Sequence, residues 1–430
     1  MTALAWLSVA VFLGAYALIA TERIHRVASA LGGAGIMLAV HASDAEAAFF
    51  SPESGIDWNV IFLLLGMMVI VGVLKQTGIF EYLAIWAAKR AKGRPFRLMV
   101  LLVLITALAS ALLDNVTTVL LIAPVTFLVC QRLALPAVPF LLAEAMASNI
   151  GGAATLVGDP PNIIIASRSG LSFNDFLVHM APMIVILMVV FVGLCRILFR
   201  KAFVYDPERA AGIMALDERE AIADRTLLWQ SLVVLAVVMA AFVLHPVLHY
   251  EPSVVAILGA GVLVAATKVT TEQAIAEVEW PTLVFFMGLF VMVGGLVETG
   301  VIGQISQAAV GATEGRLGLT AIGLLWASAG ISAIVDNIPY VATMSPIVAD
   351  LVQANGGGDQ AQVLWWALAF GADLGGNATA VGAAANVVII GIAARNRTPI
   401  SFWEFTRYGL VVAFVTVALV TPYLWLRYLM

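Results

Sequence analysis

Apolar segments long enough to cross a lipid bilayer recur along the whole chain, and they limit its fold more than any other feature. Residues 4–20, 228–244 and 410–426 are three examples. A helix that crosses the hydrocarbon core needs roughly 20 residues, with about 17 at the short end. Only 11% of the 430 residues are charged, against about one-quarter in soluble domains. We therefore predict an all-α integral membrane protein.

The chain also carries an internal repeat. Asp114-Asn115 recurs as Asp336-Asn337, 222 residues later, and Pro124 recurs as Pro346 with the same spacing. The segment 151–158 recurs at 375–382, 224 residues later. Chance similarity between apolar helices would match leucine and alanine, whereas these matches involve aspartate, asparagine and proline. The sequence therefore predicts two related halves.

The predicted fold has about ten transmembrane helices, two re-entrant hairpins and two broken helices. Because the first half crosses the membrane an odd number of times, the second half enters from the opposite side, as in the inverted repeats of many transporters. The predicted units are a first repeat at 1–199, with a hairpin at about 98–131 and a broken helix at about 137–168; a charged cytoplasmic linker at 200–226; and a second repeat at 227–430, with a hairpin at about 318–350 and a broken helix at about 362–394.

The distribution of basic residues predicts the orientation. With the N-terminus outside, all but three of the 22 lysines and arginines fall on one side of the membrane. The three exceptions are Arg168, Arg316 and Arg427. Because loops rich in lysine and arginine stay in the cytoplasm, we predict a multi-pass inner-membrane protein with both termini extracytoplasmic.

Four polar segments interrupt the apolar pattern, at 112–118, 147–162, 334–339 and 372–386. Irregular backbone at this depth is tolerated only where it is buried in protein or lines a wet cavity. Broken helices present carbonyls to cations and helix N-termini to anions. We therefore predict that the four segments converge on one binding site. The candidate residues are Asp114, Asn115, Thr117, Asn149, Gly151, Gly152, Thr155, Asp159, Asn162, Asp336, Asn337, Asp373, Gly375, Gly376, Asn377, Thr379 and Asn386.

The candidates differ in how strongly their chemistry indicates function. A carboxylate in the middle of an apolar segment costs about 2.5–3.5 kcal/mol on insertion scales, so Asp114 and Asp336 are the leading candidates for handling a solute or a coupling ion. The coupling ion bound at each pair, Asp114-Asn115 and Asp336-Asn337, is either a proton or sodium. Asp159 and Asp373 either bind or cap a half-helix. The paired glycines at 151–152 and 375–376 fit close helix packing as well as a site.

The interrupted motifs resemble those of the ion transporter superfamily, which includes arsenite-efflux permeases, the melanosomal P protein, sodium/proton antiporters and citrate or dicarboxylate carriers. The motifs lie at 113–118, 151–162, 335–339 and 373–379, and the resemblance is strongest to the arsenite-permease and P-protein branch. It implies a scaffold domain and a transport domain, often in a dimer, with an elevator-like movement. The carboxylate carriers typically have Ser-Asn-Thr at their hairpin tips, whereas this chain has Asp-Asn at both.

The resemblance implies secondary active transport, with proton-coupled efflux of arsenite or antimonite as the leading hypothesis. A neutral hydroxide needs hydrogen-bonding groups, which Asn115, Asn337, Thr155 and Thr379 supply. A sodium/proton antiporter and a sodium-coupled anion or carboxylate transporter are the alternatives, and the sequence leaves open a soluble ATPase partner, which some arsenite permeases have. No nucleophile–base spacing or nucleotide-binding loop indicates an enzyme, and we expect no cofactor and no nucleic-acid partner.

The orientation predicts which positions an impermeant thiol reagent reaches in intact cells. In a background lacking Cys130 and Cys195, a cysteine at Glu53 should be labelled directly. Cysteines at Arg94 or Arg209 should be labelled only after permeabilisation, since both positions are predicted to be cytoplasmic. Labelling at position 94 in intact cells would show that the predicted orientation is reversed.

Overall fold

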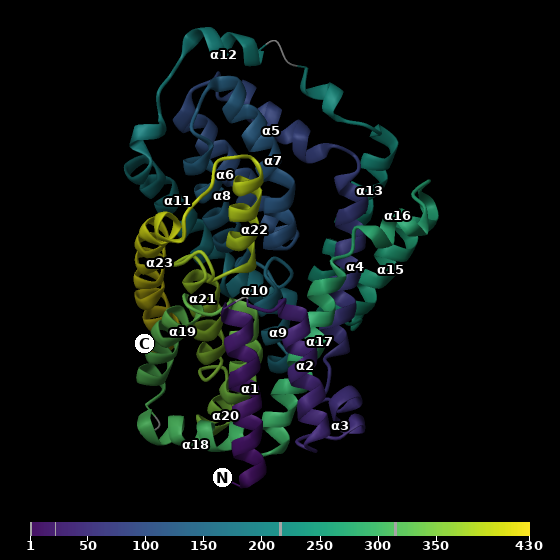
Figure 1. The fold of residues 1–430 in the computed structure, drawn as a ribbon, viewed down its shortest axis with the longest axis vertical. Helices are drawn as coiled ribbons and strands as arrows, with labels where there is room; N and C mark the ends of the chain where they lie inside the picture. The colour runs from purple at the N-terminus through teal and green to yellow at the C-terminus, as the bar shows by residue number, and fades with distance from the viewer. Residues whose placement is uncertain (1, 22, 215–216, 314–315) are drawn as a thin grey trace.

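Helices form throughout the molecule, as expected where lipid cannot pair with backbone groups. The computed structural model describes residues 2–21, 23–214, 217–313 and 316–430, and every regular element among them is helical (Figure 1). The first half contains α1 (Ala3–Thr21), α2 (Arg26–Ala39), α3 (Ala45–Phe50), α4 (Trp58–Lys75), α5 (Ile79–Arg90), α6 (Pro95–Leu112), α7 (Asn115–Leu133), α8 (Ala137–Gly152), α9 (Pro160–Ser169), α10 (Phe173–His179) and α11 (Ala181–Leu198).

The connection and the second half continue the same pattern. The connection contains η1 (Arg200–Ala202), α12 (Pro207–Met214) and η2 (Glu218–Ala221). The second half contains α13 (Arg225–Val243), α14 (His245–Leu248), α15 (Pro252–Ala266), α16 (Thr271–Ala276), α17 (Trp280–Glu298), α18 (Val301–Thr313), α19 (Leu317–Ser332), α20 (Asn337–Ala354), α21 (Val363–Gly375), α22 (Ala384–Arg395), α23 (Phe402–Leu424) and η3 (Trp425–Leu429). The predicted all-α fold is confirmed.

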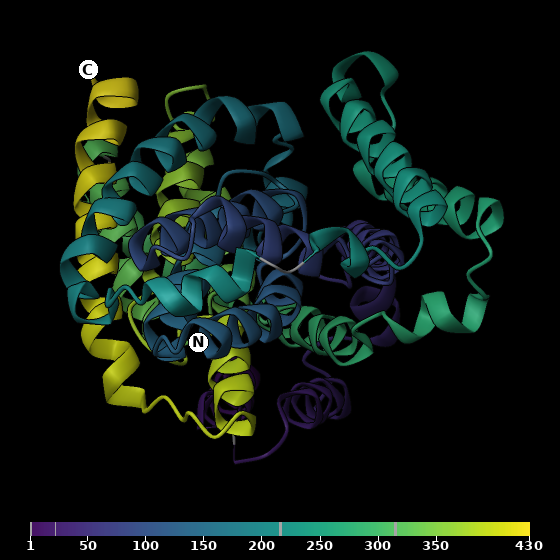
Figure 2. The same cartoon turned by 90° about the horizontal axis from the view of Figure 1, so that it is seen from above.

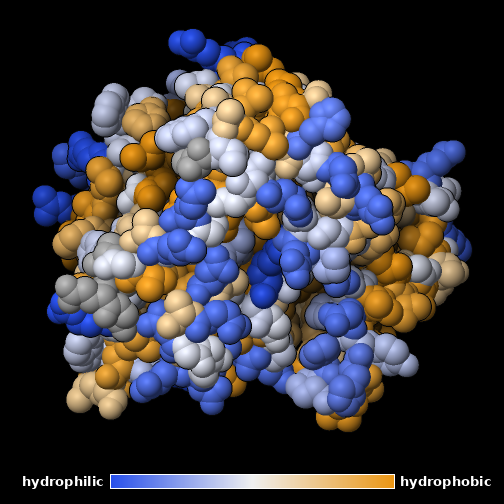
Figure 3. All heavy atoms as spheres, turned by 90° about the horizontal axis from the view of Figure 1, so that it is seen from below, coloured by the Kyte–Doolittle hydropathy of each residue, from blue (hydrophilic) through white to orange (hydrophobic). Residues whose placement is uncertain are grey.

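Seven of the described helical segments are long and apolar enough to cross a bilayer: α4, α6, α7, α11, α13, α17, and α23 together with η3. Apolar stretches of 10–17 residues occur in α1, α2, α15, α19, α21 and α22. Hydrophilic residues gather over the centre of the face seen from below, whereas its edges carry hydrophobic and hydrophilic residues side by side (Figure 3). This is a multi-pass membrane protein, and its orientation in the membrane stays a prediction.

The two halves are interlocked by contacts that come in repeat-related pairs. Helix α6 packs on α8, and the equivalent α19 packs on α21. Helix α7 contacts α22 and α20 contacts α9, so each hairpin touches the broken helix of the other half. Figure 1 places α6, α7 and α8 in the upper part of the molecule and α19, α20 and α21 in the lower part. The broken segments of both halves therefore meet at the centre.

A second group of helices flanks this bundle. Helix α4 packs on α15, and its counterpart α17 packs on α2. Both contacts use a glycine: a Cβ on Gly66 would lie 2.6 Å from the carbonyl carbon of Ala256, and one on Gly288 would lie 2.9 Å from that of Ala30. Figure 2 shows α13 and α15 at the edge of the molecule, apart from the larger bundle. Small residues therefore set the helix spacing on this flank.

The charged linker is held against α5. The backbone N–H of Ala223 donates to the Thr77 carbonyl at 3.0 Å, and Lys89 forms an ion pair with Glu218. The hydrogen bond from the Lys89 ammonium lowers the pKa of the Glu218 carboxyl. Positions 215–216 of the predicted linker lie outside the described residues. The rest of the linker includes short helical turns.

Replacing Gly66 with alanine should destabilise the protein, because the new Cβ would overlap the backbone of α15. Overpacking of this kind lowers the free energy of unfolding by about 1–3 kcal/mol. Gly193 is the matched control, since a Cβ there would meet no atom within 4 Å. Thermal unfolding in detergent should show a lower midpoint for G66A than for the wild type and for G193A. Equal midpoints would contradict the close α4–α15 contact.

Candidate functional site

The two hairpins bend at aspartates that cap the following helices. Asp114 accepts hydrogen bonds from the N–H of Thr117 at 2.8 Å and from its hydroxyl at 2.5 Å. Asp336 accepts one from the N–H of Ile338 at 3.0 Å. Both carboxylates are half-buried. The leading candidates of the sequence thus have a structural role as N-caps of α7 and α20, and their role in binding stays a prediction.

The candidate threonines tie each broken helix to its own hairpin. The Thr155 hydroxyl donates to the Ala111 carbonyl at 2.6 Å, and the Thr379 hydroxyl donates to the Ala333 carbonyl at 2.5 Å. Both carbonyls lie just before a hairpin bend, where they have lost their helical partners. These hydroxyls therefore fix the loops of the site, and each donates its hydrogen bond to a backbone carbonyl.

The candidate glycines allow close helix packing. A Cβ on Gly151 would lie 2.3 Å from the Ala107 carbonyl oxygen, and one on Gly375 would lie 2.5 Å from that of Ala329. A Cβ on Gly152 would lie 2.5 Å from the carbonyl oxygen of Gly158. Gly376 is in the equivalent place, 3.0 Å from that of Gly382. The packing interpretation of these glycines accounts for all four.

Four of the candidate asparagines form a chain of amide hydrogen bonds across the two halves. The Asn115 Nδ2 donates to the Oδ1 of Asn149 at 3.2 Å. The Asn149 Nδ2 in turn donates to Asn377 at 3.0 Å and to Asn386 at 3.1 Å. All four side chains are buried. The structure thus brings together residues from α7, α8, the loop after α21, and α22.

Asp159 joins this cluster to both hairpins. It is fully buried and accepts hydrogen bonds from the Nδ2 of Asn115 at 3.1 Å and from that of Asn337 at 3.4 Å. Although Asp159 precedes α9 as its N-cap residue, its side chain makes no capping hydrogen bond. Asp114, Asp336 and Asp373 are its charged neighbours. Asp159 therefore lies where the two halves meet.

Asp373 is the second fully buried aspartate, and it is held differently. The Asn162 amide lies beside it, but its Nδ2 donates to the Thr155 carbonyl at 3.1 Å. Within the described ranges, neither carboxylate oxygen of Asp373 reaches a donor in hydrogen-bonding geometry, and the buried Nδ2 of Asn377 and Oδ1 of Asn162 are also unpaired. Unpaired buried polar atoms are rare in proteins and often mark a functional site.

The two fully buried aspartates are not equivalent by the repeat. At a spacing of 224 residues, Asp159 corresponds to Ala383, and Asp373 corresponds to Asn149. The fully buried part of the site's charge therefore comes from positions where the halves differ. The repeat spacing contained this signal, although the sequence alone did not rank these two aspartates above Asp114 and Asp336.

Two cavities next to the hairpin bends contain residues that the sequence did not single out. One, of about 300 Å³, is lined by His25, Arg26, Asp336 and the first turn of α22. A smaller one is lined by Arg26, Asp114, Glu279 and Thr282 among others. The basic residue shared by both cavities is Arg26.

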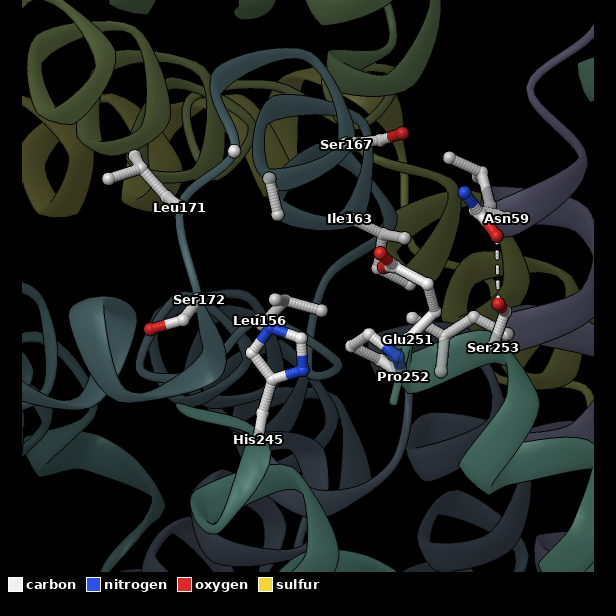
Figure 4. Close-up of a pocket in the computed structure, with 14 residues that line it drawn as sticks. Asn59, Leu156, Ile163, Ser167, Leu171, Ser172, His245, Glu251, Pro252 and Ser253 are labelled. Atoms are coloured by element: carbon white, nitrogen blue, oxygen red, sulfur yellow. Dashed lines mark hydrogen bonds between the residues drawn. The ribbon is translucent and has the colours of Figure 1, made fainter. Parts of the chain in front are cut away.

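A third cavity, of about 230 Å³, lies between α4, α9 and the start of α15. Its polar lining includes His245 and Glu251, and the Ser253 hydroxyl donates to Asn59 at 2.9 Å (Figure 4). Leu63 and Ile163 line this cavity. Their repeat equivalents are Phe285, 222 residues after Leu63, and Val387, 224 residues after Ile163, and both line the cavity beside Asp336. The two cavities are therefore related by the repeat.

Comparison with known proteins places this site in context. A family model described as citrate transporter matches residues 16–371. A Mycobacterium tuberculosis protein described as an uncharacterized transporter is 58% identical over 421 residues, which cover 98% of each chain. The human P protein is 33% identical over 481 residues, which cover 94% of this chain and 57% of the P protein.

The fold also has a counterpart among solved structures. The YdaH transporter of Alcanivorax borkumensis superposes with a TM-score of 0.60 over 85% of this chain and 84% of that one. The sequences are 15% identical. A likeness at this identity shows the fold, and function has to be argued from the site.

Replacing Asn149 with alanine should destabilise the protein, because the amides of Asn115, Asn377 and Asn386 lose a partner in a buried place. A loss of about 1–3 kcal/mol in the free energy of unfolding is typical for such unpaired groups. Asn355, which follows α20, is the matched control, because among the described residues its side-chain amide donates only to the Leu351 carbonyl, at 2.8 Å. Thermal unfolding in detergent should separate N149A from N355A, and equal midpoints would contradict a cross-linked centre.

Proposed function

The chain belongs to the citrate transporter family and is a secondary membrane transporter, and from this premise we propose that protons or sodium ions bound at Asp159 and Asp373 drive its transport. The resemblance to the P-protein branch is confirmed by the match to the human protein. The family assignment supports a transporter rather than an enzyme.

The observation that carries the proposal is the state of Asp373. An isolated carboxylate buried in protein is stable only when a proton or a cation neutralises it. Asp373 is fully buried, and within the described part of the chain no donor meets its carboxylate oxygens in hydrogen-bonding geometry, although the Asn162 amide lies beside it. The amide of Asn162 lies beside Asp373, and its unpaired Oδ1 is a hard oxygen ligand of the kind that sodium accepts. A titratable or cation-binding carboxylate between the two halves is what ion coupling requires.

As the solute we propose the neutral hydroxide of trivalent arsenic or antimony, moved outwards. The described hydrogen bonds within the asparagine–aspartate cluster join amides and a carboxylate to one another and include no lysine, arginine or histidine, which suits a neutral solute better than a free anion. A neutral hydroxide exchanges hydrogen bonds with amide and carboxyl groups. Outward transport against a gradient then uses inward movement of the coupled cation.

A carboxylate solute is the second candidate, and it is favoured by the family's description as citrate transporter. In that case bound cations would have to neutralise the acidic centre before the anion enters. A sodium/proton antiporter is the remaining alternative, in which the cations are themselves the cargo. All three share the same cation site, which is why the cation is the first element of the proposal.

Movement of the site is proposed to follow the elevator-like mechanism of the superfamily. The hairpins and broken helices form the larger bundle, whereas α2, α4, α15 and α17 form a flanking layer joined by glycine contacts. Only short contact regions link the two, such as α4 with α9 and α17 with α20. Such a division is suited to sliding of one group past the other.

Purified protein in lipid vesicles provides the test. Under an imposed proton gradient, arsenite should accumulate in vesicles that contain the protein and not in empty ones. Citrate and sodium are measured separately under the same gradient, and arsenite and citrate also under a sodium gradient. Transport of citrate alone would select the carboxylate alternative, and sodium movement alone the antiporter. If no solute responds to either gradient, the proposal fails.

Replacing Asp373 with asparagine should uncouple transport, because the amide keeps the size but binds neither proton nor cation. Coupling energies of about 1–3 kcal/mol correspond to 5- to 150-fold effects, so gradient-driven accumulation should fall at least about tenfold while solute exchange at equal concentrations persists. D159N should behave alike. D350N is the control, since Asp350 is exposed on α20. Normal accumulation by both central variants would contradict their role as cation carriers.

A further inference from the structure

We propose that Arg26 is a built-in countercharge, which pairs with the hairpin aspartates when no coupling cation is bound. This inference rests on the proposed function, since it assigns to Arg26 the control of the same acidic site. Three observations support it. Arg26 lies between two cavities that contain the hairpin aspartates, its guanidinium makes weak contacts, and the equivalent position beside the repeat-related cavity is a proline.

Arg26 is the first residue of α2 and lies on the wall between two cavities. The cavity of about 300 Å³ contains Asp336, and the smaller one contains Asp114 and Glu279. Glu279 has both Asp114 and Arg26 as charged neighbours. A long, flexible side chain at this wall therefore has repeat-related aspartates on its two sides.

The guanidinium of Arg26 has unused binding capacity. Its Nη2 donates to the Thr282 hydroxyl at a long 3.5 Å, and its Cζ lies 5.6 Å from the centre of the Phe285 ring. Thr282 donates onwards to Glu279 at 3.2 Å. The ion pairs of the described residues are Lys75–Glu277, Lys89–Glu218 and Arg209–Asp206, so Arg26 has none among them. An arginine has five N–H donors that fit a carboxylate in a bidentate manner, and among the described residues the Arg26 guanidinium uses one of them, on Thr282.

The repeat shows that the fold does not require this charge. Gly66 packs on Ala256 and its counterpart Gly288 packs on Ala30, which aligns α15 with α2. In this alignment Arg26 corresponds to Pro252, which follows Glu251 in the third cavity. The cavity beside Asp336 thus has Arg26 at a position where the third cavity has Pro252, next to Glu251.

A countercharge solves a physical problem of the empty transporter. Without a cation, four neighbouring carboxylates would have to move together through an apolar protein, and uncompensated buried charge opposes such a step. Pairing with Arg26 reduces the negative charge and allows the empty site to return. Because Asp114 and Asp336 are charged neighbours of Asp159, a cation at Asp159 and an Arg26 paired with the hairpin aspartates compete to neutralise the same negative charge. The apparent affinity for the cation is therefore reduced in proportion to the fraction of carriers in which Arg26 is unpaired.

Charge-changing variants in lipid vesicles test this role. In R26Q, the half-saturating concentration of the driving cation, measured for sodium at fixed pH and for protons without sodium, should fall roughly three- to tenfold, since a competitor is gone. Net transport into solute-free vesicles should decrease, because the empty return is slowed, while solute exchange is maintained. R26K should keep the wild-type pattern. R23Q is the matched control, because Arg23 is exposed and lines neither cavity.

Three other outcomes would contradict the countercharge role or the proposed function. If R26Q raises the KM for solute and leaves the cation response unchanged, Arg26 binds the solute and the countercharge role is wrong. If R26Q is not produced in folded form and R26K loses net transport relative to exchange, positive charge alone does not suffice and the proposal also fails. A wild-type protein that responds to no cation would instead overturn the proposed function.

Discussion

The hydrogen bonds that Asp159 accepts from Asn115 and Asn337 hold the centre of this protein together. This buried carboxylate lies just before α9 and accepts hydrogen bonds from the first residues of α7 and α20, the second helix of each hairpin. Because a buried charge is strongly stabilised by such donors and strongly destabilised without them, the positions of both hairpins and of the broken helix depend on one another. The amide chain through Asn149 extends this dependence to α22.

The surrounding packing serves this centre. Glycines let α8 approach α6 and α21 approach α19, which brings the polar loops into register with the hairpin bends. Thr155 and Thr379 then fix those loops to carbonyls that the bends leave unpaired. Asp114 and Asp336 complete the bends as helix caps. Polar side chains are thus satisfied in pairs related by the repeat, and the structure is stable without exposing irregular backbone to lipid.

The charge of the site departs from this symmetry, and that departure underlies the proposed mechanism. Asp159 and Asp373 occupy positions where the other half has alanine and asparagine. Arg26 lies beside one of two related cavities, and the equivalent position beside the other is Pro252. A symmetric scaffold supplies two alternative arrangements of similar energy, whereas unsymmetric charges make a bound ion favour one of them. Cation binding at the carboxylates and pairing with Arg26 would bias these arrangements in opposite directions.

The sequence by itself determined the fold class, the repeat and the four segments that converge, because apolar length and rare intramembrane Asp, Asn, Gly and Pro are local features with strong physical consequences. It also predicted the asparagines that form the central cluster. It could not rank the aspartates: Asp114 and Asp336 look most unusual along the chain, yet they cap helices, while Asp159 and Asp373 are the fully buried pair. Arg26 lay outside the candidates because it begins a helix beside a loop. Only the tertiary structure decided these points, since burial and hydrogen-bond partners arise from contacts between segments as far apart as Arg26 and Thr282.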